Sequence, residues 1–404
     1  MRYDTVIIGG GLSALLCGIE LARNGKKAAI VTTGHSSLHF SSGSFGLYNA
    51  AEPLKAVELL PEDHPYSKLG EDVDSLATKA TEILNIAGIA TVGTAEANHY
   101  IMTPTGAMRQ CWLSMEGMVT SKDGKSLDFG SALILCPEGF LDFYTQFVAE
   151  SLNKLGVETS QAVFSLPELV IRRNNPTEMR STSVARALDK EENIQTLAGI
   201  ISREAKGVDT VIMPAVLGFE RTDVLSRLEK ATDKRILTVA TLPPSVEGIK
   251  TERALRKTFE HMGGVIFNGH TATSFTMEDG AVESITTAKG ITLTANEFVL
   301  AAGSFIGGGL EALRSGVVEK LFGADVAAPA VRKLTDSNLY EPQPFMSAGV
   351  VTDSQFKISI GGAVVDNLYG CGAILSGYNP VKEGCGAGVA MFTALKVADN
   401  ILNR

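Results

Sequence analysis

The sequence has few cysteines, and their spacing excludes the usual metal-cluster motifs. The five cysteines are scattered along the chain and no two form a CxxC pair. This spacing argues against an iron–sulfur cluster held by this chain, and the odd, scattered set favours a reducing cytoplasm. The cysteines are Cys17, Cys111, Cys136, Cys371 and Cys385.

Long hydrophobic runs and basic clusters are also missing. The first apolar stretch, Val6 to Ala22, is broken by three glycines and lacks a basic n-region, so we do not expect a signal peptide. No other run approaches the roughly 20 apolar residues that span a bilayer, so any membrane association would require a partner. Lys and Arg number 36 against 45 Asp and Glu, which gives a formal charge of −9. Without a basic run, nucleic acid is not expected as a partner.

An acidic residue is missing where a dinucleotide-binding protein commonly has one. No Asp or Glu occurs between Glu20 and Glu52, although an acid about 20 positions after a glycine motif would bind an adenosine ribose. Either Thr32, Thr33 or Ser36 binds the ribose of a dinucleotide, or the ligand is a mononucleotide. The gap weakens the case for NAD, leaves FAD possible and makes FMN a candidate.

The N-terminal segment has the pattern of a βαβ unit. A strand over Tyr3–Ile8, a helix over Leu12–Asn24 and a strand over Ala28–Thr33 are predicted. The intervening GxGxxA motif permits a tight turn, close backbone approach to a phosphate and close helix–sheet packing. A phosphate would lie at the helix N-terminus, where free N–H groups and the helix dipole stabilise its charge. The predicted phosphate-site residues are Gly9, Gly11, Ala14 and Gly18.

Two further regions add candidate cofactor contacts. The Ser- and Gly-rich loop over residues 36–48 offers donors for phosphate or ribityl oxygens. Near the C-terminus, a glycine loop opens the last helix, and a bare helix N-terminus suits the pyrimidine end of an isoalloxazine ring. The alternative is glycine used only for helix–sheet packing. The additional cofactor residues are Thr32, Ser41, Ser42, Gly43, Gly303, Gly372, Gly386 and Gly388.

The order of these segments predicts an α/β fold with two domains. Residues 1–87 and 245–404 predict a discontinuous Rossmann-like flavin-binding domain, with a parallel sheet and a β-meander over residues 264–291 that turns at Asp279 and Gly280. Residues 88–244 are predicted to form an inserted α/β cap domain, with an amphipathic stretch over Leu141–Leu155. A chain of 404 residues exceeds the roughly 250–300 residues at which single cores stop growing.

The residues that could take part in catalysis are less clearly indicated by the sequence than the cofactor site is. His39 follows the second strand and is the candidate base, although a loop histidine bonded to its neighbours is an equal alternative. Arg109 is the candidate for binding an anionic substrate. Cys371 and Cys385 could be redox-active near a flavin, but buried packing is the alternative. No metal site is predicted. The other cap arginines considered for the anion are Arg172, Arg173, Arg180 and Arg221.

Several segments together resemble the B subunits of the anaerobic glycerol-3-phosphate dehydrogenases. They are the opening RYDTVIIGGGLSALLCGIELARNG, the loop HSSLHFSSGS, the cap segment LPELVIRRNNPTEMRSTSVARALDKEEN, the stretch TLPPSVEGI and the tail GYNPVKEGCGAGV. The resemblance covers essentially the whole chain. The broader fold also resembles the fumarate reductase and succinate dehydrogenase flavoproteins. His35 and His39 do not match the covalent flavin motif of those proteins, so a non-covalent cofactor is expected.

The resemblance implies a flavoprotein subunit that uses FMN, with FAD as the alternative. It implies an FAD-bearing A subunit and a membrane-associated iron–sulfur C subunit as partners. The complex would oxidise sn-glycerol 3-phosphate to dihydroxyacetone phosphate and pass electrons to quinone for fumarate or nitrate respiration. The chain would be cytoplasmic and peripheral on the inner membrane through a partner. Two alternatives are a stand-alone fumarate-reductase-like oxidoreductase and a non-catalytic assembly subunit.

Overall fold

The computed structural model describes residues 1–404 apart from the side chain of Glu71. Both ends of the chain build the larger sheet, in the order β13–β2–β1–β16–β15–β14, with β22 beside the second half of β16 and β21 beside β22. Strands β13, β2, β1, β16 and β22 run parallel, and β14, β15 and β21 pair antiparallel. The bounds are β1 (Arg2–Ile8), β2 (Ala28–Thr32), β13 (Val265–Asn268), β14 (Ala272–Glu278), β15 (Ala281–Thr287), β16 (Thr292–Leu300), β21 (Lys357–Ile360) and β22 (Ala363–Gly370).

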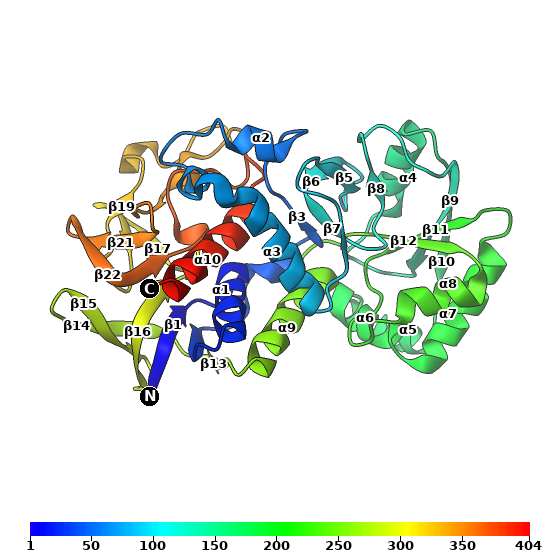
Figure 1. Ribbon diagram of the computed structural model, residues 1–404. Coiled ribbons are helices and arrows are strands. Elements are labelled where there is room, and N and C mark those ends of the chain that lie inside the picture. Colours follow the sequence, from blue (N-terminus) through cyan, green and yellow to red (C-terminus); the bar gives the residue numbers. More distant parts are fainter.

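Helices α1 (Leu12–Arg23), α3 (Val73–Ile86) and α10 (Gly386–Leu402) pack side by side over this sheet (Figure 1). Helix α1 also approaches α9 (Val246–His261) closely, since a Cβ at Gly18 would lie 2.9 Å from the ring of Phe259. Strand β2 is buried along its whole length, as its apolar run predicts. The predicted βαβ unit is therefore present, within a residue or two of the expected bounds.

One predicted strand belongs elsewhere. Residues 264–291 do form consecutive short strands, and Asp279 has a φ of 50° in the turn between β14 and β15. Strand β13, however, is not part of the meander, because it pairs in parallel with β2 at the edge of the sheet. The helix over Val246–His261 precedes β13 in the chain, and β13 then runs in the same direction as β2.

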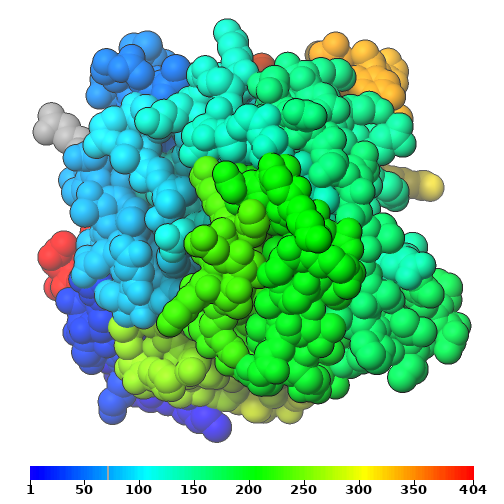
Figure 2. Space-filling view, turned by 90° about the vertical axis from the view of Figure 1, so that its right-hand side faces the viewer, coloured from blue at the N-terminus to red at the C-terminus, as the bar shows by residue number. Residues whose placement is uncertain are grey.

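A second, fully parallel sheet has the order β10–β9–β11–β12. It lies at the opposite end of the molecule (Figure 1), and the green segments that surround it face the viewer in Figure 2. The predicted amphipathic stretch from Leu141 begins its helix only at Thr145, because Asp142 is buried and accepts the backbone N–H of Ser181. The bounds are β9 (Ser131–Pro137), β10 (Glu158–Phe164), β11 (Thr210–Pro214), β12 (Arg235–Val239), α4 (Thr145–Lys154), α5 (Pro167–Arg172), α6 (Ser181–Leu188), α7 (Glu191–Glu204) and α8 (Val224–Thr232).

Short strands connect and flank the two sheets. Two three-stranded sheets, β3–β7–β4 and β6–β5–β8, lie between them. The bounds are α2 (Pro53–Val57), β3 (Ser44–Phe45), β4 (Thr91–Val92), β5 (His99–Met102), β6 (Met108–Cys111), β7 (Leu113–Met115), β8 (Thr120–Ser121), β17 (Leu310–Leu313), β18 (Gly316–Glu319), β19 (Val326–Ala327) and β20 (Gly349–Val350).

The hydrophobic residues form two cores, one at each sheet. Trp112 and Leu113 pack in the first core, although they fall within the predicted cap, and Val119 packs in the second. Helix α9 (Val246–His261) spans both: Val246 belongs to the second core and Phe259 to the first. The division at residues 88 and 244 stays a prediction. Among the described residues, no helix combines the length and apolarity needed to cross a membrane.

Candidate functional site

The larger cavity, of about 860 Å³, opens at the carboxyl end of the parallel strands. Gly9, Gly10 and Gly11 line it between β1 and α1. Gly9 has a φ of +124°, which a residue with a side chain rarely adopts, and a Cβ at Gly11 would meet nothing within 4 Å. The N-terminus of α1 has no side-chain cap and no acid in its first turn. Its free amides therefore face open space, as a phosphate site requires.

The N-terminus of α10 lines the same cavity. Gly386, Ala387 and Ala390 contribute to its wall, and α10 also has no side-chain cap and no acid in its first turn. The cavity thus has two uncapped helix ends, each able to stabilise negative charge. A flavin nucleotide carries a phosphate at one end and a ring that becomes negative on reduction at the other. The residues present fit such a group.

Carboxylates near this cavity are already engaged. Glu319 is the one acidic residue among the described residues that line it, and its oxygens accept the backbone N–H groups of Leu321, Phe322 and Ala324. Thr32, predicted as a cofactor contact, does line the cavity, but its hydroxyl donates to the carbonyl of Gly34. The acid missing from the end of β2 is therefore not replaced by a free carboxylate in the wall.

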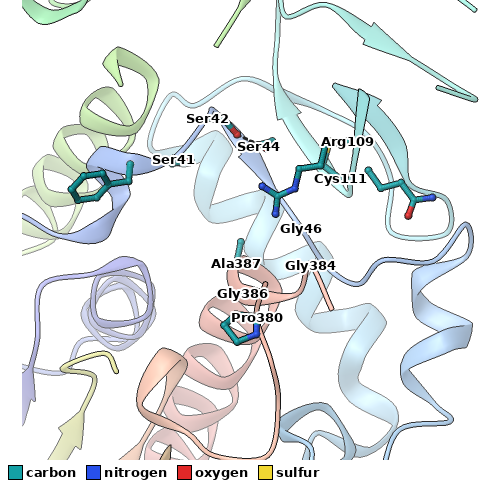
Figure 3. Close-up of a pocket in the computed structure, with 12 residues that line it drawn as sticks. Ser41, Ser42, Ser44, Gly46, Arg109, Cys111, Pro380, Gly384, Gly386 and Ala387 are labelled. Carbon is teal, nitrogen blue, oxygen red and sulfur yellow. Dashed lines mark hydrogen bonds between the residues drawn. The ribbon is translucent and has the colours of Figure 1, made fainter. Parts of the chain in front are cut away.

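A smaller cavity, of about 250 Å³, adjoins the α10 end of the larger one and shares Phe40, Ser41, Ser44, Gly386 and Ala387 with it. Arg109, from β6, extends toward the first turn of α10 (Figure 3). Gln110 also lines this cavity and donates from its side chain to the hydroxyl of Tyr100 at 2.8 Å. The hydroxyls of Ser42 and Ser44 lie 2.8 Å apart at its edge.

Arg109 differs from the other candidate arginines. It is exposed and, among the described side chains, forms no ion pair. Arg172 pairs with Glu168 and Glu178, Arg173 with Glu138, Arg180 with Asp142, and Arg221 with Glu191 and Asp223. Arg109 is thus the cation whose charge is available to an anion in the smaller cavity.

His39, the candidate base, lines neither cavity. Its Nε2 lies 3.2 Å from Oε2 of Glu252, a carboxyl that is 2 % exposed. Burial lowers the pKa of His39, an effect that the nearby Glu252 carboxylate opposes. Nε2 of His39 therefore lies against a buried carboxylate and not against either cavity.

The turn before α10 is fixed by a buried histidine. His64 accepts the backbone N–H of Tyr66 at Nδ1, so its Nε2 carries the proton and donates to Glu383 at 3.1 Å. Glu383 also accepts the backbone N–H of Asn379. The hydrogen bond from His64 holds the pKa of Glu383 below its usual value, although burial acts in the opposite direction. This bond orients the loop that carries Gly384 and Gly386 into the cavity walls.

The structure brings about half of the predicted cofactor residues to the cavities. Gly9, Gly11, Thr32, Ser41, Gly303 and Gly386 line the larger one, and Ser42 lines the smaller. The other five support these walls through packing: Ala14 is fully buried, and Cβ atoms at Gly18, Gly43, Gly372 and Gly388 would meet Phe259, Glu247, Ser13 and Tyr66. Sequence reasoning missed the wall formed by Gly307–Gly309, for which the run of three glycines was a visible signal. It also missed Phe40, Gln110, Lys320 and the residues 270–273 after β13.

All five cysteines are buried and free. Burial raises the pKa of Cys111 and of Cys371 to about 12, and it raises that of Cys385 as well. Because the thiolate is the reactive form, we expect a disulfide reagent at pH 8 to leave the native chain unlabelled and to label all five after denaturation. Rapid labelling of Cys371 or Cys385 in the native chain would instead support a redox role.

The fold and the shared cavity define a flavin-binding protein. A family model described as an FAD binding domain matches residues 4–389. Over its full length, the chain belongs to the family of anaerobic glycerol-3-phosphate dehydrogenase B subunits. It is 40 % identical to the member from Pectobacterium atrosepticum over 416 residues, and 38 % identical to that from Yersinia enterocolitica over 418 residues. Each comparison covers 100 % of this chain and 99 % of the relative.

Solved structures with similar folds are more distant. The 3-ketosteroid Δ1-dehydrogenase from Sterolibacterium denitrificans is 12 % identical with a TM-score of 0.45, covering 100 % of this chain and 99 % of that one. The L-proline dehydrogenase from P. horikoshii is 11 % identical with a TM-score of 0.38, covering 100 % and 94 %.

Proposed function

We propose that this chain is the flavin-bearing B subunit of an anaerobic glycerol-3-phosphate dehydrogenase and takes part in oxidising sn-glycerol 3-phosphate to dihydroxyacetone phosphate. The observation that carries this proposal is the junction of the two cavities at the first turn of α10. The smaller cavity holds about 250 Å³, which suits a small metabolite, and Arg109 offers it an unpaired cation among the described side chains. A phosphorylated polyol matches both properties.

Each wall of this junction has a separate role in the proposal. When bound, the flavin would supply the acceptor for the two electrons that leave the secondary carbinol carbon as a hydride, and the hydroxyl proton would pass to water, because no histidine or carboxylate is among the described residues that line the smaller cavity. Arg109 binds the substrate phosphate, and the amides of α10 stabilise negative charge at the ring side of the junction. Gln110 and the Ser42 and Ser44 hydroxyls orient the substrate hydroxyls by hydrogen bonding. His39 is not assigned as the base, because its Nε2 faces Glu252.

We propose FMN as the flavin. The engaged state of Glu319 supports this choice, since an adenosine ribose would find no free carboxylate among the described residues in the wall. FAD is the second candidate, because the cavity continues past the glycine loop to Thr33, Ser36 and residues 270–273. Heat release of the cofactor from the purified chain, followed by chromatography and mass measurement, is expected to give FMN. Recovery of FAD would show that FMN is the wrong assignment and that the chain binds the dinucleotide.

We propose further that the chain works with an FAD-bearing A subunit and an iron–sulfur C subunit, is cytoplasmic, and reaches the inner membrane and quinone through them. The subunit names of its relatives and the lack of a CxxC pair support this arrangement. Co-purification of three chains from membranes, released by mild detergent, is the expected result. A chain that purifies alone and remains active would contradict the complex.

Anaerobic addition of glycerol 3-phosphate to the assembled complex tests the reaction. The absorbance of the flavin bound to this chain is expected to bleach on substrate addition, and to return with a quinone analogue. Reoxidation by fumarate without other subunits would favour a stand-alone fumarate-reductase-like enzyme. A chain that binds no flavin but is needed for assembly would be a non-catalytic subunit.

A further inference from the structure

The loop over residues 35–41 forms a wall shared by the two cavities. His35, Ser36, Ser37 and Leu38 line the larger cavity, and Phe40 and Ser41 line both. The loop contains one short 3-10 turn, Ser37–Phe40, and no longer helix or strand. A wall with so little regular structure needs contacts from elsewhere to hold its shape.

Those contacts come from the first two turns of α9. Glu252 is 2 % exposed, and its Oε2 accepts the backbone N–H of Ser36 at 3.1 Å and the hydroxyl of Ser36 at 2.7 Å. Nε2 of His39 lies 3.2 Å from the same oxygen as a close polar contact. One buried carboxylate therefore accepts two hydrogen bonds at the start of the 3-10 turn and lies beside His39 near its end, and such charge-assisted bonds are about twice as strong as neutral ones.

Ser245, the N-cap of α9, adds two further links. Its backbone N–H donates to the carbonyl of His39 at 2.8 Å, and its hydroxyl bonds to the carbonyl of Ser41. Gly248 lies directly beneath the carbonyl of Leu38, where a Cβ would collide with the oxygen. The loop thus lies flat on the helix, with the Glu252 carboxylate at its centre.

A cation is the obvious rival occupant of this cluster. Ligand atoms of His35, His39 and Glu252 lie within 4.8 Å of one another. Arg256, however, donates to Oε1 of Glu252 at 3.0 Å, so a fixed positive charge already lies on the carboxylate. A metal ion would face this guanidinium and compete with Ser36 for the other oxygen. Both oxygens of Glu252 therefore already accept hydrogen bonds, one from Ser36 and the other from Arg256.

We propose that Glu252 is a positioning residue that holds the wall between the two cavities against α9, and that His39 belongs to this tether and is not the proton acceptor of the reaction. This assignment does not depend on the identity of the substrate. This positioning role explains why His39 lies behind the wall, with its Nε2 beside the buried Glu252 carboxylate and outside the lining of both cavities.

Hydrogen exchange of the flavin-free chain tests the tether directly. In Glu252→Gln, amide exchange over residues 33–45 is expected to rise at least about tenfold, because the charged acceptor of Ser36 is lost together with the carboxylate beside His39, and flavin affinity is expected to fall about tenfold. Glu191→Gln is the matched control, since Glu191 binds Arg221 and Arg227 on the second core. Unchanged exchange and affinity in Glu252→Gln, or faster exchange spread evenly over both cores, would overturn the proposal.

A second pair of variants separates positioning from catalysis. His39→Gln keeps a side-chain donor toward Glu252 and cannot act as a base, so flavin affinity and turnover in the assembled complex are expected to stay within about twofold. His39→Ala loses the donor and is expected to weaken flavin binding. Loss of turnover by about 100-fold or more in His39→Gln, with flavin affinity intact, would identify a general base and overturn the assignment. If Glu252→Gln does not fold, Ser36→Ala removes the 2.7 Å bond at the surface of the tether and should loosen the same segment several-fold.

Discussion

Replacing Gly11 by Asp will abolish flavin binding without destabilising the flavin-free chain. Gly11 is the N-cap of α1, with extended backbone angles that any residue can adopt, and a side chain there would enter the larger cavity. Two like charges 4 Å apart repel by about 4 kcal/mol at an effective dielectric constant of 20, which corresponds to roughly a thousandfold loss of affinity. Fluorescence titration with FMN and with FAD measures this loss.

The same carboxylate has the opposite effect on the helix. Asp is a better N-cap than Gly by a few tenths of a kcal/mol, so the thermal midpoint of the flavin-free chain should stay equal or rise. Gly11→Ala, which adds volume but no charge, is the control and should weaken flavin binding much less. Normal flavin affinity in Gly11→Asp would mean that the phosphate does not lie at this helix end.

Replacing Arg109 by Ala should impair the use of glycerol 3-phosphate while leaving the flavin in place. The side chain extends into the smaller cavity, and no ion pair among the described residues holds it. Loss of one charge-assisted interaction with a phosphate is expected to lower kcat/KM about 10- to 100-fold, mostly through a higher KM. Steady-state kinetics of the assembled complex, with flavin content measured in parallel, give the result.

Two variants sharpen this test. Arg109→Lys keeps the charge but lacks the planar fork of donors, so it should recover part of the loss. Arg173→Ala removes an arginine that already pairs with Glu138 at the surface, outside both cavities, and should leave KM unchanged. An unchanged KM in Arg109→Ala would mean that Arg109 does not bind the substrate phosphate. A loss of flavin from this variant would likewise contradict the proposed role, because Arg109 would then support the cofactor.

Local patterns predicted the elements that contact the larger cavity. The glycine motif, the helix Leu12–Arg23 and the buried strand Ala28–Thr32 follow from spacing alone, because a tight turn and an apolar run need no distant partner. The bare N-terminus of α10 was visible for the same reason. The β-meander was predicted with one strand too many, since nothing local distinguishes an antiparallel strand from β13.

The arrangement of the site depends on contacts that no local pattern encodes. Glu252 meets Ser36 across 216 positions of the chain, so the loop that lines both cavities is held by a helix that no local pattern places beside it. In the sequence, nothing separates Arg109 from the other candidate arginines. In the structure, it lines the smaller cavity, and no carboxylate among the described residues pairs with it. The anion-binding role of Arg109 and the positioning role of His39 stay predictions until the variants are measured.

Helix α9 joins the two cores without a linker. Val246 and Ile249 are buried in the second core, and Leu255 and Phe259, two turns later, are buried in the first. A module attached by flexible segments can be exchanged between related enzymes as a cassette. In this protein, a different second core would have to pack on α9, which also supports the Ser36–Ser41 loop. A substitution that displaces α9 in either core is therefore expected to alter the Ser36–Ser41 loop as well.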